Sequence, residues 1–262
     1  MLRKLLIMDK RKVYFNEYNV LMENAAYLPL NSGMLQCYAQ TKEVLDVNYQ
    51  FMPFNFRREH PEKIILKYDN PSVAAFSVSM WNIQLSLEVA KLVKQKYPDC
   101  LILFGGCETP RDAEEFFEKN PFIDVTVRGD GERPFVDVLE RYLESRSFDG
   151  ISSISYRDPE TGKCVKNHQE QSLNKNLDIY PSPYVQGVFD YLFDEYPNID
   201  LQAIIETNRG CPYDCSFCYW GKSDLGLKYT QFSLEYVKKV IDWCGQKNIK
   251  YIFCADSNFG IF

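Results

Sequence analysis

Three cysteines lie close together in residues 206–221, whose sequence is ETNRGCPYDCSFCYWG. Cys211, Cys215 and Cys218 have the spacing C-x3-C-x2-C. The apolar run Leu201–Ile205 in front of them predicts a strand, and the R-G-C-P sequence that follows predicts a turn. The cysteines are therefore expected on a loop that leaves the end of a buried strand. Three thiolates held this close could ligate three irons of a cubic iron–sulfur cluster and leave its fourth iron open.

Two other interpretations of these cysteines remain open on the spacing alone. Structural zinc takes four closed ligands, usually as two separated pairs, and the two histidines of the chain, His60 and His168, lie far upstream. Unligated thiols are the second alternative, whereas a disulfide fits poorly with an intracellular chain. The spacing thus favours an iron–sulfur cluster over zinc and over free thiols.

The cysteine pattern also resembles that of a known family. C-x3-C-x2-C with an aromatic residue before the last cysteine, here Phe217, resembles the radical S-adenosylmethionine enzymes. The surrounding sequence RGCPYxCxFCxWG more closely resembles the members that carry a cobalamin-binding domain in front. The resemblance implies a 4Fe-4S cluster on the three cysteines, whose open iron would chelate the amino and carboxylate groups of S-adenosylmethionine.

Four residues are candidates for contact with S-adenosylmethionine by this resemblance. Phe217 and Tyr219 flank the last cysteine and could contact adenine, although packing within the loop is an equal alternative. The strand end 255–260 occupies the position where the family carries a Gly-Gly-Glu-like stretch that meets the amino group. Asp256 and Asn258 are polar enough for that contact, but the match is positional rather than literal.

Composition bounds the class of protein. The chain has 262 residues, enough for two modest domains, with a net charge of −6 and nine cysteines. The negative charge argues against a nucleic-acid backbone as the partner. The apolar run at residues 5–8 is too short for a signal peptide, and no run approaches the roughly 20 residues of a membrane span. The odd number of unevenly spaced cysteines is not typical of a secreted disulfide framework. We therefore expect a cytoplasmic protein with neither a membrane nor a nucleic acid as partner.

The first 150 or so residues alternate strand and helix patterns, which predicts a doubly wound parallel sheet of the α/β class. The expected strands are Lys4–Met8, Val44–Phe51, Val73–Ser79, Leu101–Gly106 and Asp124–Gly129. The expected helices are Leu30–Gln40, Glu59–Tyr68, Asn82–Lys96, Ala113–Asn120 and Glu132–Glu144. A D-P-E-T-G turn between Ile151–Arg157 and Lys163–Lys166 predicts a hairpin that closes the domain.

Three loops of this predicted sheet follow the carboxyl ends of strands, where ligands bind in doubly wound folds. They are residues 79–82, 105–108 and 128–132, and their glycines would let a large ligand approach the backbone. Their order resembles the cobalamin-binding domains found before radical S-adenosylmethionine modules, although G-D-G alone is typical of an ordinary tight turn. The resemblance assigns cobalamin contacts to Ser77, Ser79, Trp81, Asn82, Gly105, Gly106, Gly129, Gly131 and Glu132. For Trp81, a place in the core beside a strand is the alternative.

The loop ahead of the first predicted helix lacks a cobalt ligand. Cobalamin carriers of the mutase type use a D-x-H-x-x-G loop whose histidine ligates cobalt, but the corresponding residues 28–33 are LPLNSG. His60 is the only histidine in residues 1–167, and its sequence context predicts a solvated helix start. We thus expect a cobalt without a protein histidine ligand.

These patterns divide the chain into three parts. Residues 1–167 are expected to form a cobalamin-binding, Rossmann-like domain, residues 168–200 a linker, and residues 201–262 the start of a radical S-adenosylmethionine partial TIM barrel. The last part contains a predicted helix at Ser233–Gln246 and a predicted strand at Tyr251–Asp256. About 60 residues cannot close a barrel whose βα units take roughly 30 residues each. We therefore expect a truncated barrel that is inactive by itself.

The resemblance implies a cobalamin-dependent radical S-adenosylmethionine enzyme, with methylation of an unactivated carbon in a small-molecule or peptide substrate as the expected reaction. The reduced cluster would cleave S-adenosylmethionine to a 5′-deoxyadenosyl radical that takes hydrogen from the substrate, and methylcobalamin would donate the methyl group. A flavodoxin- or ferredoxin-like reductant is the implied partner. Cyclisation or rearrangement without methyl transfer is the alternative chemistry, and a non-catalytic cofactor-binding fragment is the alternative for this chain alone. The sequence names neither the substrate nor a catalytic residue.

Overall fold

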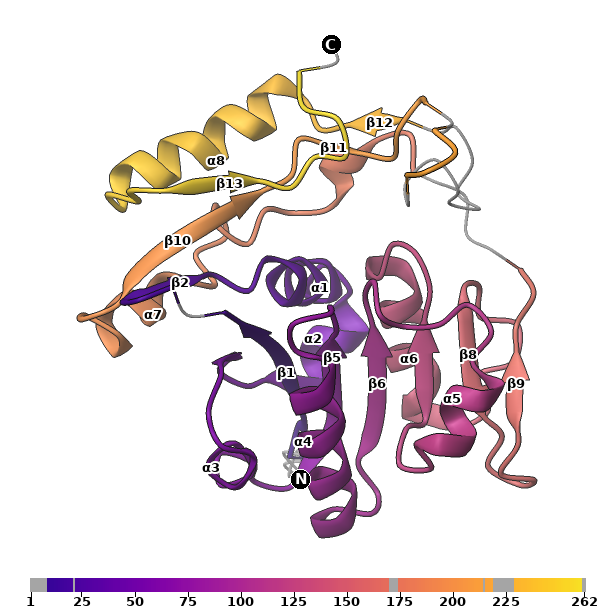
Figure 1. Cartoon of the computed structure of the whole chain (residues 1–262). Coiled ribbons are helices and arrows are strands. Elements are labelled where there is room, and N and C mark those ends of the chain that lie inside the picture. Colours follow the sequence, from indigo (N-terminus) through magenta and orange to yellow (C-terminus); the bar gives the residue numbers. More distant parts are fainter. Residues whose placement is uncertain (1–8, 21, 170–173, 214, 219–228, 261–262) are drawn as a thin grey trace, which may run out of the picture.

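The computed structural model describes residues 9–20, 22–169, 174–213, 215–218 and 229–260. An eight-stranded sheet with helices on both faces forms the larger part, and a three-stranded sheet lies beyond its carboxyl-terminal edge (Figure 1). The strand predicted at Lys4–Met8 falls outside the described residues.

The large sheet is parallel over most of its width. Its strand order is β3 (Tyr49–Phe51), β1 (Arg11–Asn19), β5 (Pro71–Ser77), β6 (Leu101–Gly105), β7 (Val125–Val127), β8 (Ile154–Arg157) and β9 (Cys164–Lys166), and β4 (Asn55–Arg57) also pairs with β1. Pairing is parallel from β3 to β7 and antiparallel for β8 and β9. The prediction of a doubly wound parallel sheet, with an antiparallel hairpin after it, is confirmed.

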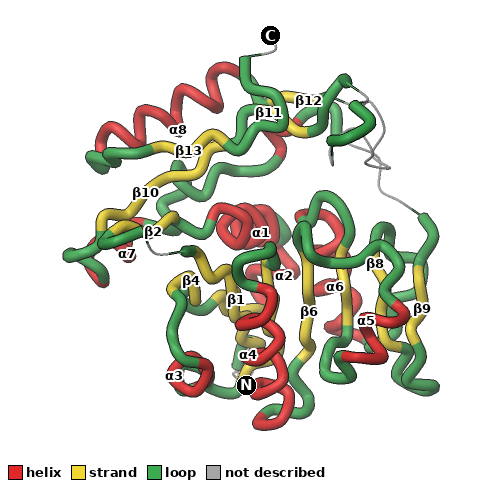
Figure 2. Tube along the Cα trace, viewed as in Figure 1, coloured by secondary structure: helices red, strands yellow, loops and turns green. Residues whose placement is uncertain are grey.

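Helices cover both faces of this sheet (Figure 2). One face of the sheet is covered by helices α1 (Leu30–Gln40), α2 (Glu43–Asn48) and α6 (Glu132–Glu144). The other face is covered by helices α3 (Pro61–Ile65), α4 (Ile83–Lys96) and α5 (Glu114–Lys119). All five predicted helices of this part are present, four of them within two residues at each end, while α3 is shorter than predicted. Among the described residues, no helix is long and apolar enough to cross a membrane.

One predicted strand is partly wrong. Val44–Phe51 was expected to be extended, yet the chain is helical over Glu43–Asn48 and only Tyr49–Phe51 joins the sheet. The β-branched residues Val44 and Val47 are exposed on this helix, whereas Leu45 is fully buried. Packing of one leucine in the core thus outweighs the strand propensity of two valines.

Strand β1, which lies between β3 and β5, has no counterpart among the predictions. Its sequence RKVYFNEYN is buried from the third residue on, although it contains Asn16, Glu17 and Asn19. Asn16 is satisfied inside the core: its Nδ2 donates to the carbonyl of Ala75 (3.2 Å), and its Oδ1 accepts from the hydroxyls of Tyr18 (2.9 Å) and Tyr68 (2.8 Å). A strand with buried polar residues gives no apolar run, so hydrophobic periodicity does not detect it.

Glu17 ties β1 to the start of helix α1. Its Oε2 accepts from the backbone N–H of Ser32 (2.8 Å) and from the Ser32 hydroxyl (2.9 Å), while its Oε1 lies 3.5 Å from Asn31 Nδ2. The carboxylate therefore satisfies donors in the first turn of a helix that has no acidic residue of its own there. Burial raises the pKa of Glu17 to about 7, and the hydrogen bonds from Ser32 oppose that rise.

The smaller sheet combines segments that are far apart in the sequence. Its order is β13 (Ile252–Cys254), β10 (Asp200–Ile205) and β2 (Ala25–Tyr27), all parallel. The other elements of this part are η1 (Leu177–Ile179), α7 (Asp190–Glu195), α8 (Leu234–Gln246) and the antiparallel pair β11 (Asn208–Arg209) and β12 (Thr230–Gln231). The predicted strand and helix pattern after residue 200 is present, but β2 comes from the N-terminal part of the chain.

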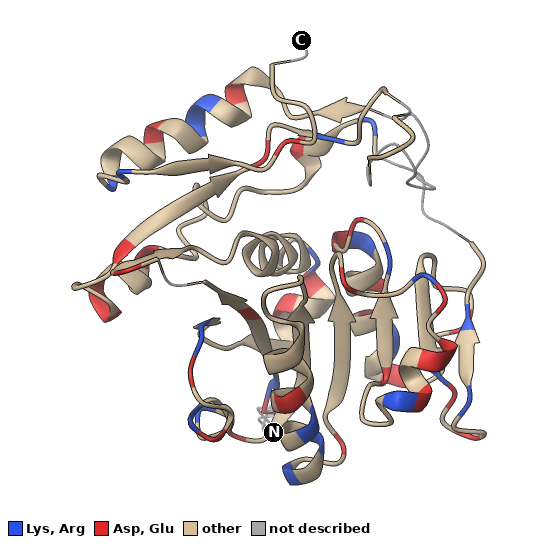
Figure 3. Ribbon diagram, in the orientation of Figure 1, with Lys and Arg blue, Asp and Glu red and all other residues tan. Residues whose placement is uncertain are grey.

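Helix α1 lies between the two sheets and carries no charged residue (Figure 3). The core beneath it continues without a break from Leu28 and Met34 to Tyr184, Phe189 and Trp243 of the second part. Contact is close, because a Cβ on the helix's only glycine, Gly33, would meet the Cβ of Pro183 at 2.7 Å and the ring of Phe189. The two parts of the chain therefore share one hydrophobic core.

The raised pKa of Glu17 predicts a pH-dependent stability. Between the ordinary carboxyl value of 4.5 and about 7, the unfolded chain releases the proton that the folded chain retains. The contribution of Glu17 to stability is therefore greatest at acidic pH and is lost as the pH rises to about 7, by roughly 3 kcal/mol at about 1.4 kcal/mol per pH unit. We expect Glu17→Gln, which cannot ionise, to gain melting temperature relative to wild type between about pH 5 and pH 8.

Glu43→Gln is the matched control, because Glu43 is exposed on α2. Its melting temperature should follow that of wild type across the same interval. A difference between Glu17→Gln and wild type that does not change with pH would contradict the assignment.

Candidate functional site

The parallel strands of the large sheet have their carboxyl ends at the edge that faces the smaller sheet (Figure 1). The chain leaves β1 to form β3 on one side and then returns to form β5 on the other. This reversal lies between β1 and β5, which is where doubly wound sheets bind ligands. The three loops predicted to contact cobalamin all follow strands on the β5 side of it.

The loop after β5 is held in shape by Asn82. This buried side chain accepts from the backbone N–H of Ser79 (2.8 Å) and donates to the carbonyl of Ser77 (3.0 Å). The two residues between Ser79 and Asn82 project into solvent: Met80 is largely exposed and Trp81 is 48% exposed. Trp81 is therefore not a core residue, and an aromatic face is available at this edge.

The loop after β6 packs on the backbone of the loop after β5. Gly106 has φ = +115°, and a Cβ there would collide with the carbonyl oxygen of Val78 and lie 2.9 Å from its nitrogen. The Val78 N–H donates to the carbonyl of Gly105 (2.7 Å), and the Val78 carbonyl accepts from Glu108 N (3.3 Å). Gly106 is thus required for the contact between two loops, and not only for space beside a ligand.

The loop after β7 makes an ion pair with the second part of the chain. Gly129 has φ = +68°, and Gly131 directly precedes helix α6. Both carboxylate oxygens of Glu132 accept from the guanidinium of Arg209, at 2.7 and 3.1 Å. The carboxylate of Glu132 is therefore already engaged by another part of the protein.

The structure adds two residues at this edge that the sequence patterns did not identify. Asn31 Nδ2 donates to Ser77 Oγ (3.2 Å), so α1 is joined to the end of β5 beside the reversal point. Glu17, at the end of β1, holds the same turn of α1. Because strand β1 gives no apolar run, the sequence patterns carried no signal for either residue.

The residues at this edge fit a large polar cofactor. The hydroxyls of Ser86, on the helix after β5, and Thr109, in the loop after β6, are buried without a hydrogen-bond partner within the described part of the chain. Buried hydroxyls normally have a partner, so two of them near one sheet edge indicate donors and acceptors for a ligand. Cys107, in the same loop, is exposed and not a packing residue.

The cysteine segment begins directly after β11, whose antiparallel partner β12 lies beyond the cysteines in the chain. Cys211 and Cys218 are half-buried, Cys215 is exposed, and the N–H of Cys218 donates to the carbonyl of Cys215 (3.0 Å). Phe217 is 91% exposed, so packing within the loop is not its role in this structure; Tyr219 lies outside the described residues. Where the chain is described, no three His, Cys, Asp or Glu side chains gather around a single ion position.

The donor set nevertheless fits an iron–sulfur cluster. Three cysteines with no histidine beside them are the ligands of such clusters, whose irons are spread over a cube and not held at one point. Because Cys215 and Phe217 face solvent, this segment can close around a cluster without opening the core.

The segment after β13 holds the backbone that leads to the cysteines. Asp256 accepts from Thr207 N (2.6 Å), from the Thr207 hydroxyl and from Asn208 N (3.2 Å), so both of its oxygens are used. Asn258 Nδ2 lies 3.9 Å from the sulfur of Cys211. Asn258 is therefore directed at a predicted cluster ligand, while Asp256 orients the loop.

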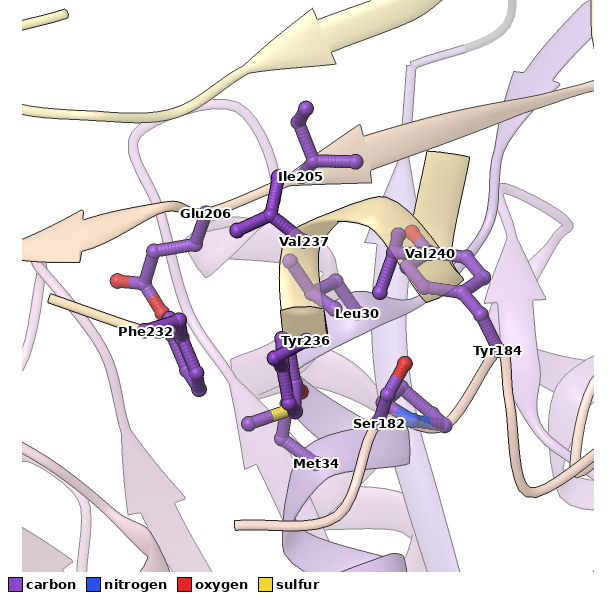
Figure 4. A pocket seen from close by; sticks show the side chains of 11 residues that line it. Leu30, Met34, Ser182, Tyr184, Ile205, Glu206, Phe232, Tyr236, Val237 and Val240 are labelled. Atoms are coloured by element: carbon purple, nitrogen blue, oxygen red, sulfur yellow. The ribbon is translucent and has the colours of Figure 1, made fainter. Parts of the chain in front are cut away.

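A small pocket lies where the two parts of the chain meet (Figure 4). Its lining is mostly apolar and comes from α1, the segment between η1 and α7, β10 and α8; Glu206, Ser182, Tyr184 and Tyr236 are the lining residues with polar side-chain atoms. The pKa of Glu206 is raised to about 7 by burial, in spite of the nearby guanidinium of Arg209.

The sequence is similar to proteins of known family. Residues 18–139 match the model of the B12 binding domain. The chain is 34% identical over 257 residues to the cobalamin-dependent radical SAM methyltransferase TokK of Streptomyces tokunonensis, covering 96% of this chain and 36% of that protein. It is 32% identical over 254 residues to a 2-(S-pantetheinyl)-carbapenam-3-carboxylate methyltransferase of Streptantibioticus cattleyicolor, with the same two coverages.

A solved structure shares the fold. The cobalamin-dependent S-adenosylmethionine radical enzyme OxsB, with aqua-cobalamin and S-adenosylmethionine bound, superposes with a TM-score of 0.74 at 23% identity, covering 96% of this chain and 34% of that one. This chain thus spans about a third of the length of the curated relatives that it matches. On these comparisons, the chain carries a B12-binding domain over residues 18–139 and is similar over nearly its whole length to cobalamin-dependent radical S-adenosylmethionine enzymes.

Proposed function

We propose that this chain provides the cobalamin site and the cluster-binding segment of a methyltransferase that acts on an unactivated carbon of a small-molecule or peptide substrate. The observation that carries the proposal is the sequence match to two methyltransferases over 96% of the chain, which includes both the sheet-edge loops and the cysteines. Cobalamin would be the methyl donor, and the cluster with S-adenosylmethionine would start the radical chemistry.

Several described residues would hold the segments that receive these groups. Asn82 and the Gly106–Val78 contact hold the loops that would receive cobalamin. Asp256 fixes the backbone in front of the cysteines, and Asn258 would donate a hydrogen bond toward the sulfur of Cys211. A flavodoxin- or ferredoxin-like donor would supply the electron, and the exposed side of the cysteine segment is accessible to it.

Anaerobic reconstitution of the chain with iron and sulfide should give about four irons per chain and the absorption and electron paramagnetic resonance spectra of a 4Fe-4S cluster. Changing Cys211, Cys215 and Cys218 to Ala should abolish this uptake. Cys244→Ala should not, because Cys244 is buried on α8 away from the cysteine segment. Stoichiometric zinc that resists exchange for iron would falsify the cluster assignment.

Cobalamin binding should depend on the contact between the loops after β5 and β6. Gly106→Ala forces a Cβ into the Val78 carbonyl, so the loop that carries Ser77 and Ser79 must move. We expect cobalamin affinity to fall by roughly tenfold or more, measured by equilibrium dialysis, since about 1.4 kcal/mol of lost binding is one factor of ten.

Gly162→Ala is the control for backbone strain in that measurement. Gly162 also has a positive φ, +67°, but no atom lies within 4 Å of where its Cβ would be. This variant should bind cobalamin like wild type. Equal affinities for Gly106→Ala and Gly162→Ala would show that the loop contact does not shape the cobalamin site.

A further inference from the structure

Arg209 joins the two parts of the chain through an almost fully buried ion pair. Its side chain is 10% exposed and that of Glu132 is 5% exposed. The guanidinium donates to both oxygens of Glu132, at 2.7 and 3.1 Å, in the bidentate geometry that gives the strongest and most directional of such pairs. Glu132 stands in the first turn of α6, in the part of the chain that matches the B12-binding domain.

Further groups hold the guanidinium in place. Its Nε donates to Glu206 (2.9 Å), its NH1 lies 3.4 Å from Asp130, and its Cζ lies 5.3 Å from the ring centre of Tyr180. All three guanidinium nitrogens therefore have a carboxylate partner, and the guanidinium also lies near an aromatic ring. A lysine has a single point charge and could not keep this set of directions.

Arg209 lies close to the cysteine segment in the chain, so its ion pair with Glu132 can affect that segment. It is two residues before Cys211, and its backbone pairs with Thr230 in the short ladder of β11 and β12. The cysteine segment therefore starts directly after a residue whose side chain is fixed to the other part of the protein. The segment after β13 holds the backbone on either side of Arg209: Asp256 accepts from Thr207 and Asn208, and the Ser257 hydroxyl donates to the carbonyl of Gly210.

We propose that Arg209 is a positioning residue, which fixes the Cys211 end of the cysteine segment to the loop between β7 and α6 through Glu132. The geometry of the cluster site then depends on a carboxylate of the B12-binding part. This inference rests on the proposed function only in taking Cys211 as a cluster ligand. The contact also links the two candidate cofactor sites, because the loop after β7 is one of the loops at the cobalamin edge.

The test compares three variants of the full chain with wild type. Glu132→Gln keeps the size of the side chain and removes its charge, and Arg209→Lys keeps the charge and removes the fork. Asp124→Asn is the control: Asp124 forms a comparably buried ion pair with Lys94 (2.8 Å; side chains 16% and 21% exposed), within the first part of the chain. Melting temperatures of all four proteins measure how much each change destabilises the fold.

Two readouts then separate positioning from general stability. In the reconstituted proteins, we expect iron loss to a chelator to be about tenfold faster for Glu132→Gln and Arg209→Lys than for wild type and Asp124→Asn, since outer-shell partners of metal ligands typically have effects of this size. In the proteins without iron, amide hydrogen exchange of residues 208–211 should be faster in the same two variants only.

The outcomes decide the matter in either direction. Equal iron loss and equal exchange in Glu132→Gln and Asp124→Asn would overturn the proposal and leave the pair with a purely stabilising role. If Glu132→Gln does not fold, Glu132→Asp takes its place, because the shorter side chain keeps the charge but cannot reach both nitrogens. If wild type takes up no iron, the cluster assignment fails, and the exchange measurement still shows whether Arg209 anchors the segment.

Discussion

Helix α1 has to bury its surface on two sides, and most of the architecture depends on that constraint. The helix has no charged residue, and its neighbours are the large sheet on one side and the segment around Pro183 and Phe189 on the other. Its first turn is held by the carboxylate of Glu17 and reaches Ser77 through Asn31. One helix therefore fixes both the separation of the two parts and the reversal point of the sheet where a cofactor would enter.

Electrostatics at the joint adds direction to this apolar contact. One guanidinium, Arg209, is surrounded by Glu132, Glu206 and Asp130, more negative charge than it can balance. Burial raises the pKa of Glu206 to about 7 and also raises that of Asp130, so burial opposes the ionised form of both carboxyls in spite of the guanidinium. Such a cluster contributes little net stability in general. Its value lies in the fixed directions that it imposes on the loops at either side.

The predictions from sequence were reliable where a local pattern carries the information. The parallel strands with continuous apolar runs, such as Leu101–Gly105, and the long amphipathic helix Glu132–Glu144 are where the sequence predicted them. Strand β1 was missed because its polar residues are satisfied only by tertiary partners, and Val44–Asn48 was mispredicted because propensity gave way to packing. That Ala25–Tyr27 pairs with β10 is a contact across about 175 residues of chain, for which no local signal exists.

The two halves of the candidate site differ in how much of their shape is held by contacts within the protein. This difference follows from how each half is packed. At the cobalamin edge, loops contact each other backbone to backbone at Gly106 and Val78, and Asn82 closes the turn, so the shape exists before a ligand arrives. In the cysteine segment, Cys215 and Phe217 are exposed, and the fixed points at the Cys211 end are Arg209, the hydrogen bond from the Ser257 hydroxyl to the carbonyl of Gly210, and the Asn258 amide. Since metal ligation itself provides folding energy to segments that lack a core, the chain needs to build only the anchor at one end. A fixed Arg209 next to an exposed cysteine loop agrees with this arrangement, in which the protein anchors one end of the loop and metal ligation orders the rest.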